Sequence, residues 1–325
     1  MNLQYDDEIS NGDITPVILL GAPRSGTQMY RDMICSHSSV ATWPYNEMTY
    51  MWRYGNRTYP TEEIPAELLT RKIASYIRGC FIKLSKRTGS PIIVDKTCNN
   101  CLRPDYVSAV FPEAKYIYLI RHAMDVVPST VKRATGSPPA GEYKKVFSIP
   151  KGDILYHALR VIWNHGGLLR PGNSKVRAWG PRFEGMDTLL KTKSLEEVSA
   201  HQWLRLTEVT DNYLNSPAFD SPLLRVRYEE ITKDPDNALR EVFTFLGIDT
   251  PDEILSEWRG KVRYQECGAS ARKLGTFQSA VQEIVAAKNA EHGYSAVPTV
   301  PAQLPANRLG ANMALQTSTA SQVER

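Results

Sequence analysis

The segment that most constrains this chain is residues 21–28, with the sequence GAPRSGTQ. An apolar run, PVILL at residues 16–20, precedes it, and the apolar residues that follow Thr27 have helical spacing. A buried strand that enters a glycine turn and then a helix brings backbone N–H groups and the positive end of the helix dipole to one place. The sequence therefore predicts a binding site for a phosphate-like anion at the carboxyl end of a buried strand.

The glycine spacing in this segment is G-x-x-x-x-G-T, which is that of a P-loop, but the usual lysine is missing. In the common P-loop a lysine follows the second glycine and reaches the terminal phosphates. Here Thr27 follows Gly26 directly, and the cation in the loop is Arg24, two residues before that glycine. The loop is thus predicted to bind an anion with an arginine in place of the lysine.

Short apolar segments alternate with helical patterns along the chain. Strands are predicted at residues 15–20, 91–94, 115–120 and 223–226. Helices are predicted at residues 27–37, 66–87, 125–133, 194–214 and 236–246, with ends marked by Gly89, Gly247 and a capping box of Ser194 and Glu197. This alternation indicates an α/β fold, a central parallel sheet flanked by helices on both faces. Ligands bind at the carboxyl ends of such strands, so we expect the chemistry at residues 21–27, 95–97, 121–122 and 227–229.

A single domain is predicted over residues 1–294. Residues 134–193 interrupt the alternation: a stretch rich in Pro, Gly and Lys is followed by a basic stretch with two tryptophans. We interpret this insertion as a lid or substrate-side element, with a solvated surface insertion as the alternative. From residue 295 onward Ala, Pro, Gln, Ser and Thr dominate, which predicts a disordered tail over 295–325.

The formal net charge is +4, and 42% of the residues are hydrophobic, as in an ordinary globular protein. So small a charge does not favour a nucleic-acid partner, but it allows a locally basic groove for an anion. No apolar run has the length of a membrane span, and residues 1–13 are too acidic and polar for a signal or transit peptide. We therefore expect a cytoplasmic protein with no membrane partner.

The five cysteines are an odd number in a large chain, which favours free thiols. Cys98 and Cys101 form a C-x-x-C, for which a redox pair or half of a zinc site is an alternative. No second C-x-x-C or histidine pair completes a zinc set in the sequence, so we interpret both as small apolar side chains and predict no metal site.

A second phosphate site is predicted from Arg121 and Ser129. Arg121 ends the strand at 115–120, and Asp125 is a good N-cap for the helix that follows. Pro128 and Ser129 then fall in the first helical turn, where a missing N–H removes no helical bond. An arginine and a serine that face each other there would hold a phosphate, which implies a nucleotide with anionic groups at two places.

These motifs together resemble those of sulfotransferases that use 3′-phosphoadenosine 5′-phosphosulfate (PAPS). Residues 23–28 (PRSGTQ) look like the 5′-phosphosulfate loop of that family, and residues 116–129, with a serine eight residues after Arg121, look like its 3′-phosphate block. Residues 224–231 (LRVRYEEI), followed by Asp234-Pro235 and Phe245-Leu-Gly247, resemble its R-Y-E-x-L strand and the next helix. The resemblance covers about residues 15–133 and 195–250.

The resemblance implies a role for each matching residue. The 5′-phosphosulfate would be held by loop residues Arg24, Ser25, Gly26, Thr27 and Gln28. Arg24 would also neutralise charge on the leaving phosphate oxygen. Lys96, in the family's D/E-K-T/S element, would add charge at the phosphosulfate. Arg121 and Ser129 would bind the 3′-phosphate, and Tyr228 would approach the adenine. The R-K-G-x-x-G block of the cytosolic branch of the family has no match in this chain. The nearest basic stretch contains Ser270, Arg272 and Lys273, and whether these residues contact the 3′-phosphate stays open.

The acceptor hydroxyl must lose its proton, so the resemblance also implies a general base. Glu47 is the first candidate, because branches of the family place a glutamate there. Asp95 is the second, with a role as the ion-pair partner of Lys96 as the stronger interpretation, and His122 is the third.

We therefore expect sulfuryl transfer from PAPS to a hydroxyl of a small molecule such as a natural product, by in-line displacement. We expect no metal, since a sulfuryl group carries one negative charge fewer than a phosphoryl group. N-sulfation, a carbohydrate acceptor and the oligomeric state, including a homo-oligomer, stay open. The alternatives of another class are a P-loop kinase and a non-catalytic nucleotide-binding protein. An aromatic cluster is expected either to wall the acceptor pocket or to pack in the core: Trp43, Tyr45, Tyr50, Trp52 and Tyr54.

Overall fold

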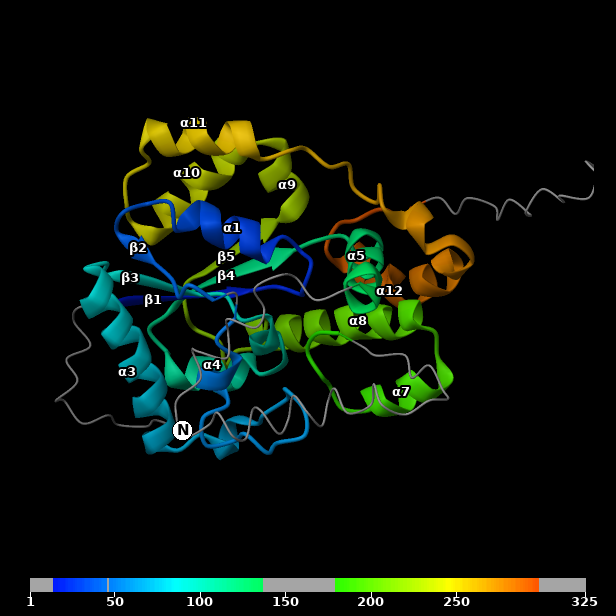
Figure 1. The fold of residues 1–325 in the computed structure, drawn as a ribbon, viewed down its shortest axis with the longest axis horizontal. Helices are drawn as coiled ribbons and strands as arrows, with labels where there is room; N and C mark the ends of the chain where they lie inside the picture. Colours follow the sequence, from blue (N-terminus) through cyan, green and yellow to red (C-terminus); the bar gives the residue numbers. More distant parts are fainter. Residues whose placement is uncertain (1–13, 46, 137–178, 298–325) are drawn as a thin grey trace, which may run out of the picture.

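The computed structural model describes residues 14–45, 47–136 and 179–297. Its centre is a sheet of five parallel strands (Figure 1), in the order β2-β3-β1-β4-β5. The strands are β1 (Thr15–Leu20), β2 (Val40–Ala41), β3 (Ile92–Asp95), β4 (Lys115–Ile120) and β5 (Leu223–Arg227). All five carboxyl ends therefore point to the same edge, where the sequence predicted the chemistry.

Helices cover both faces of the sheet. One face carries α1 (Thr27–Ile34), α9 (Tyr228–Lys233), α10 (Pro235–Leu246) and α11 (Asp252–Lys261) (Figure 1). The other face carries α2 (Thr49–Trp52), α3 (Arg71–Thr88), α4 (Pro104–Val110), α5 (Ala123–Thr135), α8 (Leu195–Leu214) and α12 (Gln278–Glu291). The remaining helices are α7 (Met186–Thr192) and the 3₁₀ helices η2 (Ala66–Leu68), η3 (Cys98–Leu102) and η7 (Ala271–Phe277).

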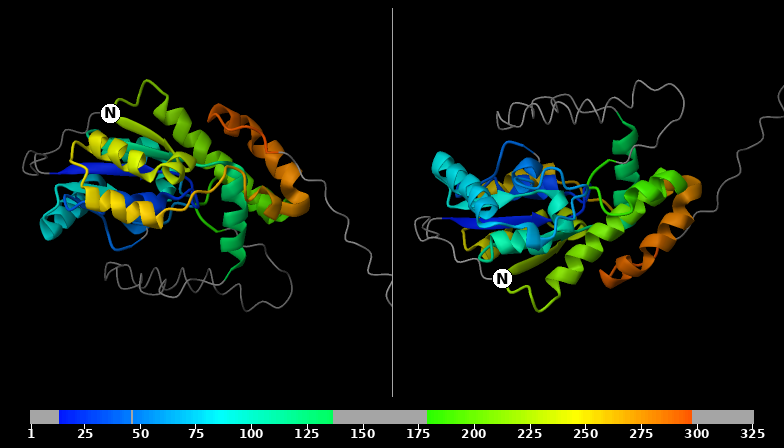
Figure 2. Two further views of the ribbon diagram at one scale, coloured as in Figure 1. Left: turned by 90° about the horizontal axis from the view of Figure 1, so that it is seen from above. Right: turned by 90° about the horizontal axis from the view of Figure 1, so that it is seen from below.

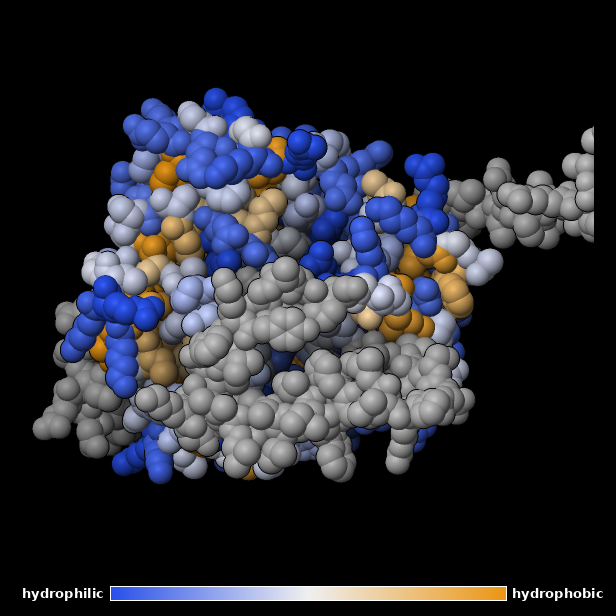
Figure 3. All heavy atoms as spheres, in the orientation of Figure 1, coloured by the Kyte–Doolittle hydropathy of each residue, from blue (hydrophilic) through white to orange (hydrophobic). Residues whose placement is uncertain are grey.

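The strands alternate their side chains between two separate cores. In β1, Val17 and Leu19 face α1 and α10, whereas Ile18 and Leu20 face the core that α3, α4 and α8 complete. All four are at most 1% exposed, as expected for a parallel sheet buried on both faces. Hydrophilic side chains dominate the outer surface over α11 and around α3 (Figure 3). The α/β fold class predicted from the sequence is confirmed.

The C-terminal helix α12 lies along α8 and reaches α5, as the turned views of Figure 2 show. Buried charges join the two helices: Asp211 of α8 pairs with Lys288 (3.4 Å) and with the Nε2 atom of His292 (3.0 Å). This contact brings Asn289 to the beginning of α5, where its side-chain oxygen accepts a hydrogen bond from the amide of Ala123.

Several predicted boundaries need correction. The helix after the loop ends at Ile34 and not at 37, and the helix predicted at 66–87 consists of η2 and a separate α3 that begins after Thr70. The ends at Gly89 and Gly247, both with positive φ, and the Ser194–Glu197 capping box are confirmed. The predicted insertion lies mostly outside the described residues, as does the predicted tail from residue 298 onward.

A buried charged triad fixes the loop between α2 and η2. The Oε2 atom of Glu62 pairs with Arg53 (3.1 Å) and Arg103 (3.0 Å), and all three side chains are buried. Burial acts to raise the pKa of Glu62, but the charges of Arg103 and Arg53 outweigh it and lower that pKa.

Replacing Glu62 by glutamine is expected to lower the free energy of unfolding by about 3 kcal/mol, because two buried guanidinium groups lose the charge between them. Chemical denaturation followed by circular dichroism measures this loss. Glu257→Gln is the control, since Glu257 pairs with Lys261 on the exposed face of α11 and should cost less than about 0.5 kcal/mol. A similar loss for both variants would show that the buried triad contributes no more to the free energy of unfolding than an exposed ion pair does.

Candidate functional site

A cleft of about 800 Å³ opens at the carboxyl edge of the sheet. Every strand end that faces it contributes: the loop after β1, Lys96 after β3, Arg121 after β4 and Tyr228 after β5. The lining also includes Glu47, Cys98, Asn99, Ser129, Arg133 and Trp258. The structure thus brings together the four segments that the sequence predicted to carry the chemistry.

The loop between β1 and α1 has two residues in the left-handed region. Gly26, the residue before α1, has φ 91°, and a Cβ atom there would lie 2.3 Å from the ring of Tyr228. Arg24 has φ 71° and is the single described residue other than glycine with a positive φ. A conformation of this kind is strained for a residue with a Cβ atom, and such strain is found mainly at binding and catalytic sites.

The amino end of α1 is open toward the cleft, whereas that of α5 is not. In the described chain no side chain caps α1, and its first turn holds no acidic residue. At α5 the amide of Ala123 donates to Asn289 (3.2 Å), that of Met124 to His122 (3.2 Å), and that of His122 to Glu229 (3.2 Å). Of these two helices only α1 keeps its amino end and dipole available for an anion.

Three arginines gather beside this helix end. Burial lowers the pKa of Arg24 below its usual value, and the charges of Arg133 and Arg121 lower it further. The Nε atom of Arg24 donates to the hydroxyl of Ser129 (3.0 Å), and Arg121 donates to the backbone oxygen of Arg24 (3.0 Å). The guanidinium of Arg121 also lies 4.0 Å from the centre of the Tyr228 ring. Cations that crowd together in this way would be stabilised by a bound anion.

A second hollow of about 640 Å³ continues from the cleft along α5 and shares Arg24, Arg121, Ser129 and Arg133 with it. Ser270 and Lys273 line this hollow, whereas Arg272 does not. Two of the three residues whose role was open thus lie in the same cavity as the predicted 3′-phosphate residues.

Asp125 does not cap α5, contrary to the prediction. The helix begins at Ala123, with His122 as its cap, so Pro128 and Ser129 lie in the second turn and not in the first. The carboxylate of Asp125 instead accepts bonds from the amides of Gly268 and Ser270, both at 2.7 Å. It thereby holds the segment with Ser270 against the hollow.

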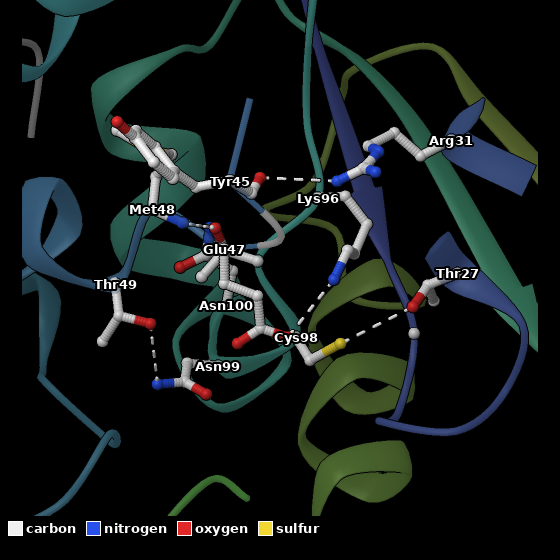
Figure 4. Close-up of polar contacts among 12 residues, drawn as sticks. Thr27, Arg31, Tyr45, Glu47, Met48, Thr49, Lys96, Cys98, Asn99 and Asn100 are labelled. Carbon is white, nitrogen blue, oxygen red and sulfur yellow. Dashed lines mark hydrogen bonds and ion pairs between the residues drawn. The ribbon is translucent and has the colours of Figure 1, made fainter. Parts of the chain in front are cut away.

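Glu47 and Lys96 also line the cleft, and their side chains face each other (Figure 4). The Nζ atom of Lys96 lies 3.3 Å from Oε1 of Glu47; the Lys96 side chain is 5% exposed and that of Glu47 31%. The first candidate base therefore has a partly exposed carboxylate at the cleft. Its neighbour in space is the lysine that the sequence predicted to bind the donor.

Asp95 has a different place from the one predicted. It is 1% exposed, and its carboxylate accepts hydrogen bonds from Trp52, Thr97 and Asn100 at 3.0–3.1 Å, while Lys96 pairs with Glu47. Burial raises the pKa of Asp95 to about 6, against the opposing effect of the Thr97 and Trp52 hydrogen bonds. The interpretation of Asp95 as the ion-pair partner of Lys96 was wrong.

The remaining predicted residues divide between the cleft and the interior. Gln28 is exposed and lines the cleft, as does Thr27, whose hydroxyl lies 3.7 Å from the Cys98 sulfur. Ser25 is 1% exposed, and its side chain lines a small internal cavity beside Tyr118 and Thr207. His122, the third candidate base, caps α5 and lies outside the cleft lining, and burial lowers its pKa.

Cys98 and Cys101 are free thiols at the bottom of this region. Burial raises the pKa of Cys101 to about 11 and that of Cys98 well above its usual value, so neither has the thiolate character of a reactive cysteine. Among the described residues no cluster of three His, Cys, Asp or Glu side chains has the arrangement of a metal site.

Two tryptophans line the cleft, Trp179 and Trp258. Trp179 lies in the insertion that the sequence predicted to be a lid or substrate-side element, whereas no sequence pattern indicated Trp258. Trp258 belongs to α11, which follows β5 in the sequence. The segment with Trp179 is held by Gln202, whose side-chain amide donates to the backbone oxygens of Trp179 and Pro181. Both reach the cleft through contacts between segments distant in sequence, and a tryptophan has no local signal for such a role. Trp52 of the predicted aromatic cluster is buried in the core.

No helix in the described ranges combines the length and the apolar composition that a membrane span needs.

Residues 16–148 match the model described as "Sulfotransferase family". A protein of Aquifex aeolicus is 22% identical over 285 residues, which are 82% of this chain and 30% of that protein. The chain thus spans less than a third of the length of this relative.

Two solved structures are also similar to the chain. The sulfotransferase domain from the curacin biosynthetic pathway is 17% identical, with a TM-score of 0.49, over 87% of this chain and 99% of that one. The sulfotransferase domain of the Synechococcus PCC 7002 olefin synthase is 16% identical, with a TM-score of 0.46, over 91% of this chain and 100% of that one. The family match includes the loop and the segment with Arg121 and Ser129, so residues 16–148 of this chain are similar to the sulfotransferase family, as its first two motifs predicted.

Proposed function

We propose that this protein transfers the sulfuryl group of PAPS to a hydroxyl group of a small molecule. The observation that carries the proposal is the lining of the cleft, which an open helix end and three arginines share with Glu47 and Lys96. A doubly anionic nucleotide suits the helix end and the arginines, and Glu47 suits the role of a base that takes the acceptor proton.

The donor would lie along the cleft with its two anionic ends at separate places. The 5′-phosphosulfate sits at the amino end of α1, between Arg24 and Thr27, with Lys96 beside the sulfuryl group. The 3′-phosphate sits in the adjoining hollow, near Ser129 and Lys273. Tyr228 and Trp258 offer aromatic faces to the adenine from the side of β5.

The reaction then needs one displacement. A lone pair of the acceptor oxygen attacks sulfur, the sulfur–oxygen bond to the phosphate breaks, and its electron pair stays on the leaving phosphate oxygen of adenosine 3′,5′-bisphosphate (PAP). Glu47 accepts the acceptor proton, and Arg24 stabilises the charge that develops on the leaving oxygen. The helix amides and fixed cations supply the positive field at this place.

The kinase alternative is less well supported by the same residues. A P-loop kinase holds Mg²⁺ with a Ser or Thr of the loop and with a carboxylate that follows a strand. The carboxylate at that position is Asp95, whose oxygens already accept three hydrogen bonds below the cleft surface. A carbohydrate or an amine as acceptor is compatible with the same donor site and is a matter for an acceptor screen.

The donor half of the proposal predicts that PAP binds with micromolar or better affinity in the presence of EDTA. Calorimetric titrations with PAP, ADP and ATP, each with EDTA and with Mg²⁺, measure this. We expect the Kd for PAP to be the same in both buffers and at least about tenfold lower than that for ADP, since ADP has no 3′-phosphate for the hollow along α5. Binding that is lost with EDTA, or equal affinity for ADP and PAP, would contradict PAPS as the donor.

A further inference from the structure

The residues that follow Glu47 are held by the turn that follows β3. The amide of Met48 donates to the Thr97 hydroxyl (3.0 Å). The Thr49 hydroxyl accepts from the side-chain amide of Asn99 (3.4 Å), as Figure 4 shows. At the end of α2, the Nε1 atom of Trp52 donates to Asp95 (3.0 Å). The segment 48–52 therefore has an anchor at each end, and Glu47 directly precedes the first of them.

Thr97 connects two of these groups through one hydroxyl. The hydroxyl donates to Oδ1 of Asp95 (3.0 Å) and accepts from the amide of Met48. The bond to the carboxylate fixes the direction of the hydroxyl hydrogen and thereby turns an oxygen lone pair toward the Met48 amide. Thr97 is 0% exposed and does not line the cleft, whereas Lys96 before it does. Its hydroxyl therefore lies below the cleft surface. Thr97 directly follows Lys96 in the sequence, and its partner Met48 directly follows Glu47.

Asp95 has no freedom to move without breaking bonds. Its Oδ2 atom accepts from Trp52 and from Asn100 (3.1 Å), and the Asn100 side chain in turn accepts from Nε of Arg103 (3.1 Å). Arg103 belongs to the buried triad with Glu62. A contiguous set of buried polar groups thus extends from the rigid triad to the segment beside Glu47.

We infer that Asp95 and Thr97 are positioning residues, which hold Glu47 beside Lys96 through the anchors at Met48 and Trp52. Neither reaches the cleft, so neither touches the donor or the acceptor. The inference rests on the proposed function, because it assigns to these residues the geometry of the proton acceptor. A carboxylate displaced by about 1 Å from the acceptor hydroxyl loses much of its effect as a base.

The test is a set of threonine variants assayed for sulfuryl transfer. Thr97→Val removes the hydroxyl and leaves the Met48 amide without its acceptor, and Thr97→Ser keeps both bonds. We expect Thr97→Val to lower kcat by about tenfold with an unchanged Kd for PAP, and Thr97→Ser to restore kcat to within about twofold of the wild type. Thr210→Val is the matched control, since Thr210 is also 0% exposed but its hydroxyl donates to Cys101 and Leu206.

A double-mutant cycle separates positioning from a general loss of structure. In the Glu47→Gln background Thr97→Val should have no further effect on kcat, because there is no longer a carboxylate to position. Amide hydrogen exchange of the peptide that contains Met48 should rise in Thr97→Val and not in Thr210→Val. Trp52→Phe, which removes the second anchor, should show the same coupling to Glu47 and serves if Thr97→Val does not fold.

The outcomes distinguish this inference from the proposed function. Equal effects of Thr97→Val in both backgrounds, or a fall in PAP affinity that matches the fall in kcat, would overturn the positioning role while PAPS transfer by the wild type stood. Absence of transfer by the wild type, with every acceptor of the screen, would overturn the proposed function and this inference with it.

Discussion

Replacing Arg24 by alanine is expected to lower kcat for sulfuryl transfer by about 10²–10³-fold, while PAP still binds with an affinity reduced by no more than about tenfold. The guanidinium lies beside the amino end of α1 and is crowded by Arg133 and Arg121 in the free protein. Charge on the leaving phosphate oxygen grows during the transfer, so Arg24 interacts more strongly with the transition state than with the bound donor. Single-turnover transfer from radiolabelled PAPS, with PAP calorimetry in parallel, measures both quantities.

The backbone of Arg24 provides the control for this experiment. With φ 71° the position suits glycine better than alanine, so Arg24→Gly should be at least as stable as the wild type and equally slow in transfer. Because the Arg24 side chain also donates to Ser129, Ser129→Ala tests how much of the effect comes from that bond. Transfer by Arg24→Gly at the wild-type rate would refute the role of the guanidinium.

Replacing Glu47 by glutamine is expected to lower kcat by about 10²–10⁴-fold with little change in the affinity for PAP. Glutamine keeps the size and the oxygen that faces Lys96 but cannot accept a proton at neutral pH. The rate is measured by mass spectrometry of the sulfated acceptor. An acceptor whose hydroxyl is already ionised at the assay pH should lose much less, because it needs no base.

Glu230→Gln is the matched control for Glu47→Gln. Glu230 of α9 is an exposed carboxylate that lies 3.9 Å from Arg227 at the end of β5, and it does not line the cleft, so its loss should leave transfer unchanged. If Glu47→Gln lowered the affinity for PAP and kcat by the same factor, Glu47 would have a structural role and the base would have to be sought elsewhere.

The parts of the fold that depend on local sequence were predicted well. A strand, a glycine turn and a helix at residues 15–34, and the helix ends at Gly89 and Gly247, follow from short-range sterics and hydrogen bonds. The strand β2 was not predicted, since two residues carry no periodicity and pair with β3 only because the whole sheet is in place.

The parts that were missed depend on contacts between distant segments. Asp125 had the sequence position of a cap, but the amides of Gly268 and Ser270, more than 140 residues later, bind its carboxylate. Asp95 next to Lys96 suggested an ion pair, yet the strand directs the two side chains to opposite sides, one into the interior and one to the cleft. The members of the site could be named from motifs, but their partners could not.

The contact between Gly26 and Tyr228 limits the mutations by which this loop can change its chemistry. A lysine at position 26 would place an ammonium group directly before Thr27, but it would replace the second glycine that a P-loop keeps before its lysine. Its Cβ atom would overlap the Tyr228 ring, and its backbone would need a φ of 91°. A small residue would have to replace Tyr228 first, which would also remove the surface on which Arg121 rests. A side chain at position 26 therefore damages the nucleotide site itself, and the loop can change its chemistry only at residues other than this glycine.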